Sequence, residues 1–172
     1  DKMGIDPTSM MTGLTFKSNI NIDNEISILK SFSLTERTLK ELEFFNVSYF
    51  VTGRVATREL YKDTPFNVEL DYDSLQVVGN KYSIEFIDNE QYRLKSKEDR
   101  CVLYDYNKDE NIAFVELPEY EGVYRFGEWV SNGFNRFRIV LNSNYDPEPK
   151  EDEIKFKYSF IVKSRLDLMR EF

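Results

Sequence analysis

The hydrophobic positions of the chain follow two different spacings, and the change from one to the other falls after Phe45. Before it, Ile22, Ile26 and Leu29 recur three to four residues apart, which is the spacing of one face of an α-helix. After it, apolar and polar residues alternate, as in strands with one face against the core and one in water. The pattern predicts an α+β fold in which mostly antiparallel sheet packs against N-terminal helices.

The N-terminal region carries two signals for a helix start. Asn21 or Asp23 can cap a first helix, and Ser33-Leu34-Thr35-Glu36 matches the capping box, in which serine and glutamate side chains satisfy free N–H groups. We therefore expect residues 23–44 to be mostly helical, as two short helices or one helix that bends near Ser31 to Ser33. The side chains expected to be buried against a sheet are Ile26, Leu29, Leu39 and Leu42.

The strand signals are spread over the rest of the chain. Gly53, Asp88-Asn89 and Pro118 mark turns or strand ends between them. A second capping box, Ser164-Arg165-Leu166-Asp167, predicts a C-terminal helix that is truncated at Phe172. The clearest alternations cover residues 47–51, 66–72, 82–86, 112–116, 137–141 and 154–162.

The length of 172 residues favours one domain. We expect residues 1–20 to be a poorly ordered lead-in segment and residues 21–172 to form a single α+β domain. Residues 67–153 are so rich in strand signals that we interpret them as a β-rich insertion in the middle of this domain. Aromatic residues make up 15% of the chain, which favours half-buried sheet surfaces.

The charge of the chain argues against nucleic acid as a partner. Lys and Arg number 23 and Asp and Glu number 31, so the net charge is −8. Phosphate binding needs a basic surface, because neutralised phosphates supply much of the affinity. The densest basic stretch, Arg93 to Arg100, is interrupted by Glu98 and Asp99, and we interpret it as a solvated strand end or loop.

The residue types that most often carry catalysis are scarce. The chain has no histidine and a single cysteine, Cys101, which we interpret as a structural thiol because it has no histidine to activate it. The glycines are scattered and form no phosphate loop. No run of apolar residues approaches the length of a membrane span. We therefore expect no catalytic, cofactor-binding or metal-binding residues, and no enzymatic activity in this chain.

Two patterns nevertheless imitate binding sites. Residues 105–109 resemble the first half of a calcium loop, with Glu116 at the twelfth position, but Glu110 occupies the place that the sharp turn reserves for glycine. We interpret the segment as a solvated hairpin loop. Among the many carboxylates, Glu119 with Glu121, or Asp71 with Asp73, could form a glycosidase pair only if they faced each other across a cleft.

The aromatic residues between positions 120 and 129 allow two interpretations. Aromatic side chains on strands bury large areas and are usually part of the core. The alternative is an exposed platform on which sugar rings stack, which makes a non-catalytic, carbohydrate-binding β-rich module the rival hypothesis for the function. The residues concerned are Tyr120, Tyr124, Phe126 and Trp129.

Two segments together resemble a known family. Residues 21–42 contain Asn-Glu-Ile-Ser-Ile-Leu-Lys-Ser from Asn24, and residues 49–66 contain Gly53-Arg-Val, then Glu59-Leu-Tyr, then Pro65-Phe. This order resembles the periplasmic part of the Wzz-type polysaccharide chain-length determinants, in particular the branch fused to an exopolysaccharide tyrosine autokinase. The matching positions carry packing rather than chemistry; they are Glu25, Ile26, Leu29, Ser31, Gly53, Glu59, Tyr61 and Pro65.

The resemblance implies a periplasmic, membrane-proximal domain of an inner-membrane protein. Proteins of that family form rings that set the length of a surface polysaccharide and aid its export. The implied partners are further copies of the same chain, assembled through the full-length membrane protein, and the polysaccharide synthesis and export machinery. The polysaccharide itself is a further candidate partner. The resemblance also implies a cytoplasmic tyrosine kinase domain in the parent protein, and none of its motifs is present here.

Overall fold

The computed structural model describes residues 7–61, 64–143 and 157–171, and it divides the chain into two compact units. The first unit ends at Leu42 and the second begins at Glu43. The boundary therefore lies about twenty residues beyond the one expected from the sequence. Residues 7–20, assigned to a lead-in segment, belong to the helix of the first unit, and residues 1–6 lie outside the described residues.

The first unit is a single helix, α1 (Pro7–Glu41). The break expected near Ser31 to Ser33 is therefore wrong, and so is the helix start at Asn21 or Asp23. Serine and threonine inside a helix can bond a carbonyl one turn back instead of capping a new helix, and Thr35 Oγ1 does so with Ser31 O at 3.0 Å. Pro7 is the first residue of the helix, where the missing N–H costs nothing.

Two of the four apolar positions expected to be buried in the helical region are exposed. Leu39 is 3% exposed, as expected, and Leu42 is only partly buried. Ile26 is 42% exposed and Leu29 is 68% exposed, so the expectation that both are buried against a sheet is wrong. The periodic spacing correctly indicated a helix, but it did not determine whether that helix face is covered.

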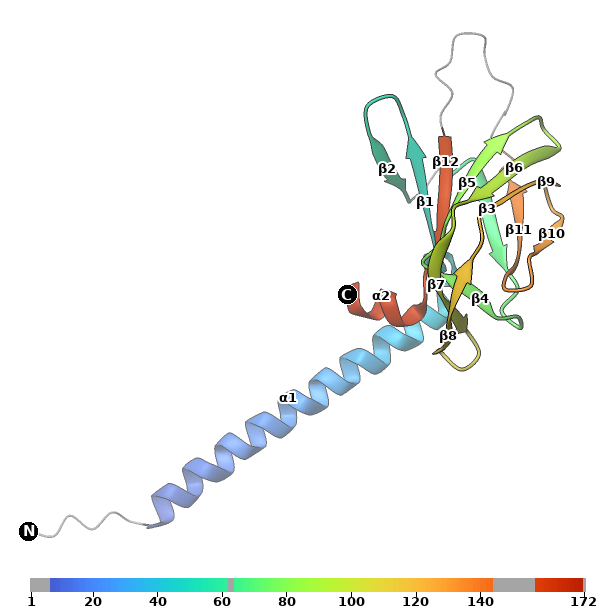
Figure 1. Ribbon diagram of the computed structural model, residues 1–172. Coiled ribbons are helices and arrows are strands. Elements are labelled where there is room, and N and C mark those ends of the chain that lie inside the picture. The colour runs from blue at the N-terminus through green and yellow to red at the C-terminus, as the bar shows by residue number, and fades with distance from the viewer. Residues whose placement is uncertain (1–6, 62–63, 144–156, 172) are drawn as a thin grey trace, which may run out of the picture. The chain divides into compact units, whose positions relative to one another are not determined.

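The second unit, which we call the β unit, consists of short strands followed by a helix (Figure 1). Before the first strand lies the short 3-10 helix η1 (Glu43–Asn46). The strands in chain order are β1 (Val47–Thr52), β2 (Thr57–Leu60), β3 (Phe66–Leu70), β4 (Gln76–Val78), β5 (Lys81–Phe86), β6 (Gln91–Ser96), β7 (Asp99–Asp105), β8 (Glu110–Leu117), β9 (Tyr120–Arg125), β10 (Trp129–Ser131), β11 (Arg136–Leu141) and β12 (Lys157–Val162), and α2 (Arg165–Glu171) follows them.

In the described part of the chain these strands form three antiparallel sheets. Sheet A has the strand order β2-β1-β12-β5-β6-β9, sheet B the order β10-β11-β3 and sheet C the order β4-β7-β8. The β12–β5 pairing joins the last strand to a strand from the middle of the chain. The strands of residues 67–153 thus share sheets with the segments that flank them. The α+β class expected from the sequence is present, with antiparallel sheets and two helices.

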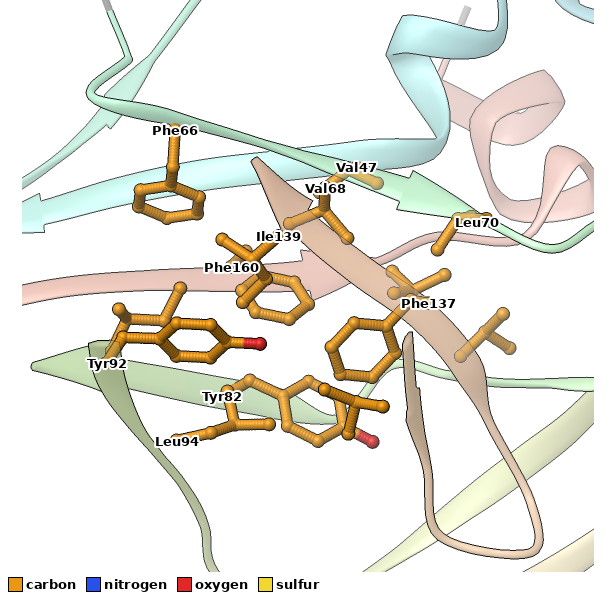
Figure 2. Close-up of a cluster of buried hydrophobic side chains, with 14 of the residues drawn as sticks. Val47, Phe66, Val68, Leu70, Tyr82, Tyr92, Leu94, Phe137, Ile139 and Phe160 are labelled. Atoms are coloured by element: carbon orange, nitrogen blue, oxygen red, sulfur yellow. The ribbon is translucent and has the colours of Figure 1, made fainter. Parts of the chain in front are cut away.

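The main core of the β unit takes side chains from all three sheets, and many of them are aromatic rings (Figure 2). Phe160 of β12 is at its centre: its ring lies 5.1 Å from the ring of Tyr82 in sheet A and 5.5 Å from the ring of Phe137 in sheet B. Phe66 contacts Phe160 from β3 at 6.4 Å. Edge-to-face and offset ring contacts of this kind add to the large apolar area that each ring removes from water.

The serine half of the C-terminal capping box is confirmed at the start of α2. The backbone N–H of Asp167 donates to Ser164 Oγ at 3.0 Å, and Ser164 Oγ lies 2.6 Å from Asp167 Oδ2. Leu168 is 4% exposed, and Leu166 packs against the main core. α2 and η1 are in contact, which places the two ends of the β unit side by side.

The strand predictions are largely confirmed. Every clear alternation corresponds to an observed strand, and β8 ends one residue before Pro118. Ile112 and Phe114 of β8 are exposed, however, so the buried face expected for this strand is wrong. For the last alternation only residues 157–162 can be compared, because Ile154 and Phe156 lie outside the described residues. The basic stretch after Arg93, expected to be a strand end or loop, begins within β6, where Arg93 bonds Glu85 and Glu121 on neighbouring strands. The strands without a sequence prediction are mainly short or carry charged residues.

Candidate functional site

The calcium-like segment forms the tight turn between β7 and β8, as the hairpin interpretation requires. Asp105 Oδ1 accepts the backbone N–H of Asn107 at 2.9 Å, so this carboxylate stabilises the turn. Asp109 has a φ of 54°, in the left-handed region that aspartate tolerates better than most residues. Its carboxylate accepts a hydrogen bond from Arg165.

The most enclosed charged group in the described part of the chain is the guanidinium of Arg165. Arg165 Nη1 donates to Asp109 Oδ1 and to the carbonyl of Tyr106, each at 2.8 Å. The rings of Tyr106 and Tyr72 lie 5.2 and 5.9 Å from its Cζ atom, within cation–π range. We call this group, Arg165 with Asp109, Tyr72, Tyr104 and Tyr106, the Arg165 cluster.

Hydrogen bonds from tyrosine complete the Arg165 cluster. Tyr104 donates its hydroxyl to Asp109 Oδ1 at 3.2 Å, and Tyr106 donates to the carbonyl of Lys163 at 2.5 Å. Burial raises the pKa of Tyr106 and of Tyr104 well above the usual value, and for Tyr104 the nearby Asp109 carboxylate adds to the effect. Both hydroxyls therefore stay protonated at neutral pH. The bonds of the cluster join α2 to the β7–β8 hairpin.

The other chemically suggestive residues have ordinary structural roles. Cys101 is 4% exposed in a small cluster with Val77 and Leu117, and burial raises the pKa of its thiol. Asp71 bonds Ser74 and lies 3.4 Å from Arg136 Nε. Glu121 pairs with Arg93 at 3.3 Å in sheet A. Asp71 and Glu121, each one member of a carboxylate pair considered from the sequence, therefore take part in contacts within the β unit.

The aromatic platform predicted by the rival hypothesis does not exist as one surface. Tyr120, Tyr124 and Phe126 are partly buried and pack against the main core. The rings of Tyr120 and Tyr124 stack at 6.4 Å over Gly122, which lies between them on β9. Trp129 lies instead in a different sheet, on β10.

Trp129 occupies the outer face of sheet B, where it is 39% exposed. Its ring lies 5.0 Å from Cζ of Arg138 and 5.3 Å from Cζ of Arg136, both on the adjacent strand β11. The two arginines are in turn paired with acidic residues: Arg138 with Glu69 at 2.6 Å and Arg136 with Asp71 at 3.4 Å. Sequence reasoning singled out Trp129 but not these partners, because charged residues alternating on a strand are also what a plain solvated face shows.

An exposed apolar row runs along α1. Ile22, Ile26 and Leu29 follow one another at intervals of four and three residues, and Phe32 and Ile28 widen the row on one side. All of them are between 42% and 68% exposed. A helix face with this many exposed apolar side chains is typical of a surface that another helix covers.

The residues that carry the family resemblance lie mostly on the surface. On α1, Ile26 and Leu29 belong to the apolar row. In the β unit, Tyr61 is 83% exposed and donates its hydroxyl to Glu59 at 3.1 Å. Gly53 forms the turn of the β1–β2 hairpin, where its N–H donates to the carbonyl of Ala56. Pro65 is buried at the start of β3.

Two further findings bear on the class of the protein. No helix in the described ranges has the length and apolarity needed to cross a membrane, and no group of three or more metal-ligating side chains gathers within those same ranges. No family model matches the chain, and no curated protein or solved structure is similar enough to count as a match.

Proposed function

We propose that this chain is the periplasmic assembly module of a polysaccharide co-polymerase, a protein that sets the chain length of a surface polysaccharide and aids its export. The parent protein would belong to the branch that carries a cytoplasmic tyrosine autokinase. The proposal starts from the resemblance in residues 21–66. It gains support from the surface position of the resembling residues Ile26, Leu29 and Tyr61, because exposed packing residues serve contacts between molecules.

The observation that carries the proposal is the exposed apolar row on α1. Leaving five large apolar side chains of one helix in water is unfavourable, since each buried one stabilises by roughly 1.5–3 kcal/mol. We assign this row to contacts between copies of the chain in the assembled ring.

Charge explains why assembly would depend on this row. The chain has a net charge of −8, so copies repel each other at modest ionic strength. Ile22, Ile26 and Leu29 offer an uncharged contact along which this repulsion is offset by burial of apolar area. The isolated chain should associate weakly, and membrane anchoring of the parent should raise the local concentration enough for a ring to form.

A matched pair of substitutions tests the proposal in the full-length parent in its own membrane. Leu29→Ser removes an apolar side chain from the row, and Leu34→Ser removes an equally exposed one, 67% against 68%, from another side of the same helix. Leu29→Ser should weaken the ring in detergent and shift the length distribution of the exported polysaccharide. Leu34→Ser should leave both unchanged. Equal behaviour of the two variants would contradict the proposal.

A further inference from the structure

On the outer face of sheet B, an aromatic, a basic and an acidic side chain form a row across the three strands. Trp129 on β10 lies opposite Arg138 on β11, and Arg138 lies opposite Glu69 on β3. The contacts run along this row: Trp129 meets the guanidinium of Arg138, which bonds Glu69 Oε2 at 2.6 Å. An aromatic face therefore lies beside a fixed donor and a fixed acceptor, in one line across the sheet.

Polar groups continue this face on both sides of the row. Ser131 lies opposite Arg136 toward one end of the strands. Toward the other end, Asn67 on β3 donates its side-chain amide to Asn142 Oδ1 at 2.7 Å. Strands are spaced about 4.8 Å apart, so the three strands span about 10 Å between β10 and β3. Two linked pyranose rings can cover that distance.

Trp129 keeps part of its surface in solvent. β10 is the edge strand of sheet B, and both guanidinium groups come from β11, its single neighbour in that sheet. Trp129 remains 39% exposed, although a large aromatic side chain is strongly favoured to be buried. A partly exposed ring that two guanidinium groups contact is pre-organised for a flat ligand on its exposed area.

We propose that the outer face of sheet B binds a neutral polysaccharide chain, with one pyranose ring stacked on Trp129. The C–H groups on one face of a pyranose are apolar and fit an aromatic ring. Its equatorial hydroxyls point sideways and both donate and accept hydrogen bonds. Arg138 supplies a donor and Glu69 an acceptor at the side of the ring, which is the combination that a hydroxyl pair needs.

The charged groups on the outer face of sheet B favour a neutral polysaccharide over an acidic one. Arg138 and Arg136 each have an acidic partner, Glu69 and Asp71, so the two pairs together carry no net charge. The chain as a whole carries −8 and repels acidic polymers. A uronate would have to displace Glu69 from Arg138, whereas a neutral sugar adds to the existing pair.

The intrinsic fluorescence of the chain provides a direct assay, because Trp129 is its single tryptophan. Titration with cellohexaose, whose hydroxyls are all equatorial, should change the emission of Trp129 in a saturable way. Hexagalacturonate, an acidic oligosaccharide of the same length, should bind at least tenfold more weakly. Equal or tighter binding of the acidic probe, or no saturable change with cellohexaose, would overturn the proposal.

The Trp129→Ala variant has no tryptophan to observe, so its sugar binding is measured by amide chemical shifts. Amide chemical shifts of wild type should move on β10, β11 and β3 when cellohexaose is added, and Trp129→Ala should lose at least tenfold in affinity by the same method. The control is Phe114→Ala, which removes an aromatic ring that is 70% exposed from β8 of sheet C and should bind like wild type. A Trp129→Ala variant that keeps its fold, judged by its amide spectrum, and still binds would also refute the site.

The binding site goes beyond the proposed assembly role, and the two can fail separately. Loss of ring formation and length control in Leu29→Ser tests assembly through α1. Saturable sugar binding by this chain tests sheet B. If sheet B binds the sugar while the Leu29→Ser parent still forms rings and controls chain length, the chain is a carbohydrate-binding module. Its site would then contain Trp129, and not Tyr120 and Tyr124.

Discussion

Asp109 and Arg165 form a nearly buried ion pair, with 2.8 Å between Asp109 Oδ1 and Arg165 Nη1 and side chains that are 13% and 9% exposed. The two residues are 56 positions apart in the chain. Their contact joins the β7–β8 turn to the first residue of α2. Because α2 follows β12 directly, this pair fixes the direction in which the chain leaves the sheets.

The first prediction concerns the loss of one partner of this pair. Asp109→Asn keeps a residue that tolerates a φ of 54° but removes the charge, which leaves the guanidinium of Arg165 nearly buried and unpaired. Breaking such a pair typically costs about 3–5 kcal/mol, so the free energy of unfolding in urea should fall by about 3 kcal/mol or more.

Two control variants distinguish the loss of the Asp109–Arg165 ion pair from a disturbance of the β7–β8 turn. Lys108→Ala changes an exposed neighbour, 66% exposed, and should alter the free energy of unfolding by less than about 0.5 kcal/mol. The double variant Asp109→Asn with Arg165→Met should be more stable than Asp109→Asn alone, because no charge is then left without a partner. A double variant as unstable as the sum of both single changes would show that the ion pair is not the cause.

The second prediction compares two phenylalanines on strands. Phe160 is 0% exposed at the centre of the aromatic core, whereas Phe114 is 70% exposed on the edge strand β8. Phe160→Ala should reduce the free energy of unfolding by about 3–5 kcal/mol, because it removes buried area and leaves a cavity. Phe114→Ala should change it by less than about 1 kcal/mol. If urea denaturation showed a similar loss of unfolding free energy for both variants, the position of Phe160 in the core would be contradicted.

The third prediction concerns alkaline pH. Burial raises the pKa of Tyr82, Tyr92, Tyr104 and Tyr106 in the folded state. In the unfolded chain the pKa of tyrosine is about 10. A raised folded-state pKa means that the unfolded state loses its protons first. The stability that these four groups contribute is therefore complete below about pH 10 and is lost as pH rises above it, by up to about 1.4 kcal/mol per group and pH unit.

Tyrosinate absorbance measures this directly. Exposed tyrosines such as Tyr61 should ionise smoothly while the fold is intact, and the four buried ones should ionise together in a cooperative step that coincides with loss of the circular dichroism of the sheets. A smooth titration of all tyrosines in the folded protein would contradict the burial of these hydroxyls.

Strand prediction succeeded where one face of a strand is buried and the other is wet. In β3 the burial alternates strictly, with Phe66, Val68 and Leu70 inside and Asn67 and Glu69 outside. The sequence pattern reports this directly, because side chains of a strand point alternately to its two faces. The weaker strands gave no such signal: β9 has charged or exposed residues at every second position and only partial burial at the others.

For the helix, the sequence pattern predicted the secondary structure but not what covers its apolar face. Ile22, Ile26 and Leu29 have helical spacing and do lie on a helix, but the same spacing serves a face against the core of one chain and a face against another molecule. The Ser33-to-Glu36 pattern also has two physical outcomes, since serine and threonine can cap a helix or bond a carbonyl within it. Local sequence does not distinguish these cases.

The Arg165 cluster and the Trp129 row could not be predicted, because each depends on strand order. Arg165 meets Asp109 only because β12 and the β7–β8 hairpin bring distant segments together. Trp129 meets Arg138 and Glu69 only through the register of β10, β11 and β3. The sequence identified Trp129 as one of four aromatic candidates, and only the pairing of strands separated it from Tyr120 and Tyr124.

The last prediction concerns Gly122, which is conformationally unremarkable but has two tyrosine rings above it. A Cβ atom at this position would lie 2.5 Å from the hydroxyl oxygen of Tyr120 and 2.8 Å from Cε2 of Tyr124. Gly122→Ala should therefore push both rings off β9 and reduce the free energy of unfolding by about 1–3 kcal/mol, as overpacking usually does. Because both rings are partly exposed, they can rotate outward, and the fold should survive.

A second substitution shows whether the rings are the cause. Tyr120→Ala removes the nearest obstacle, so the cost of Gly122→Ala should be smaller in a Tyr120→Ala background than in wild type. The comparison position is Gly79, where a Cβ atom would meet nothing within 4 Å but φ is +86°. Gly79→Ala should cost about 1–2 kcal/mol through backbone strain alone, and Tyr120→Ala should not relieve it. Equal relief at both glycines in urea denaturation would show that crowding over β9 does not determine the effect.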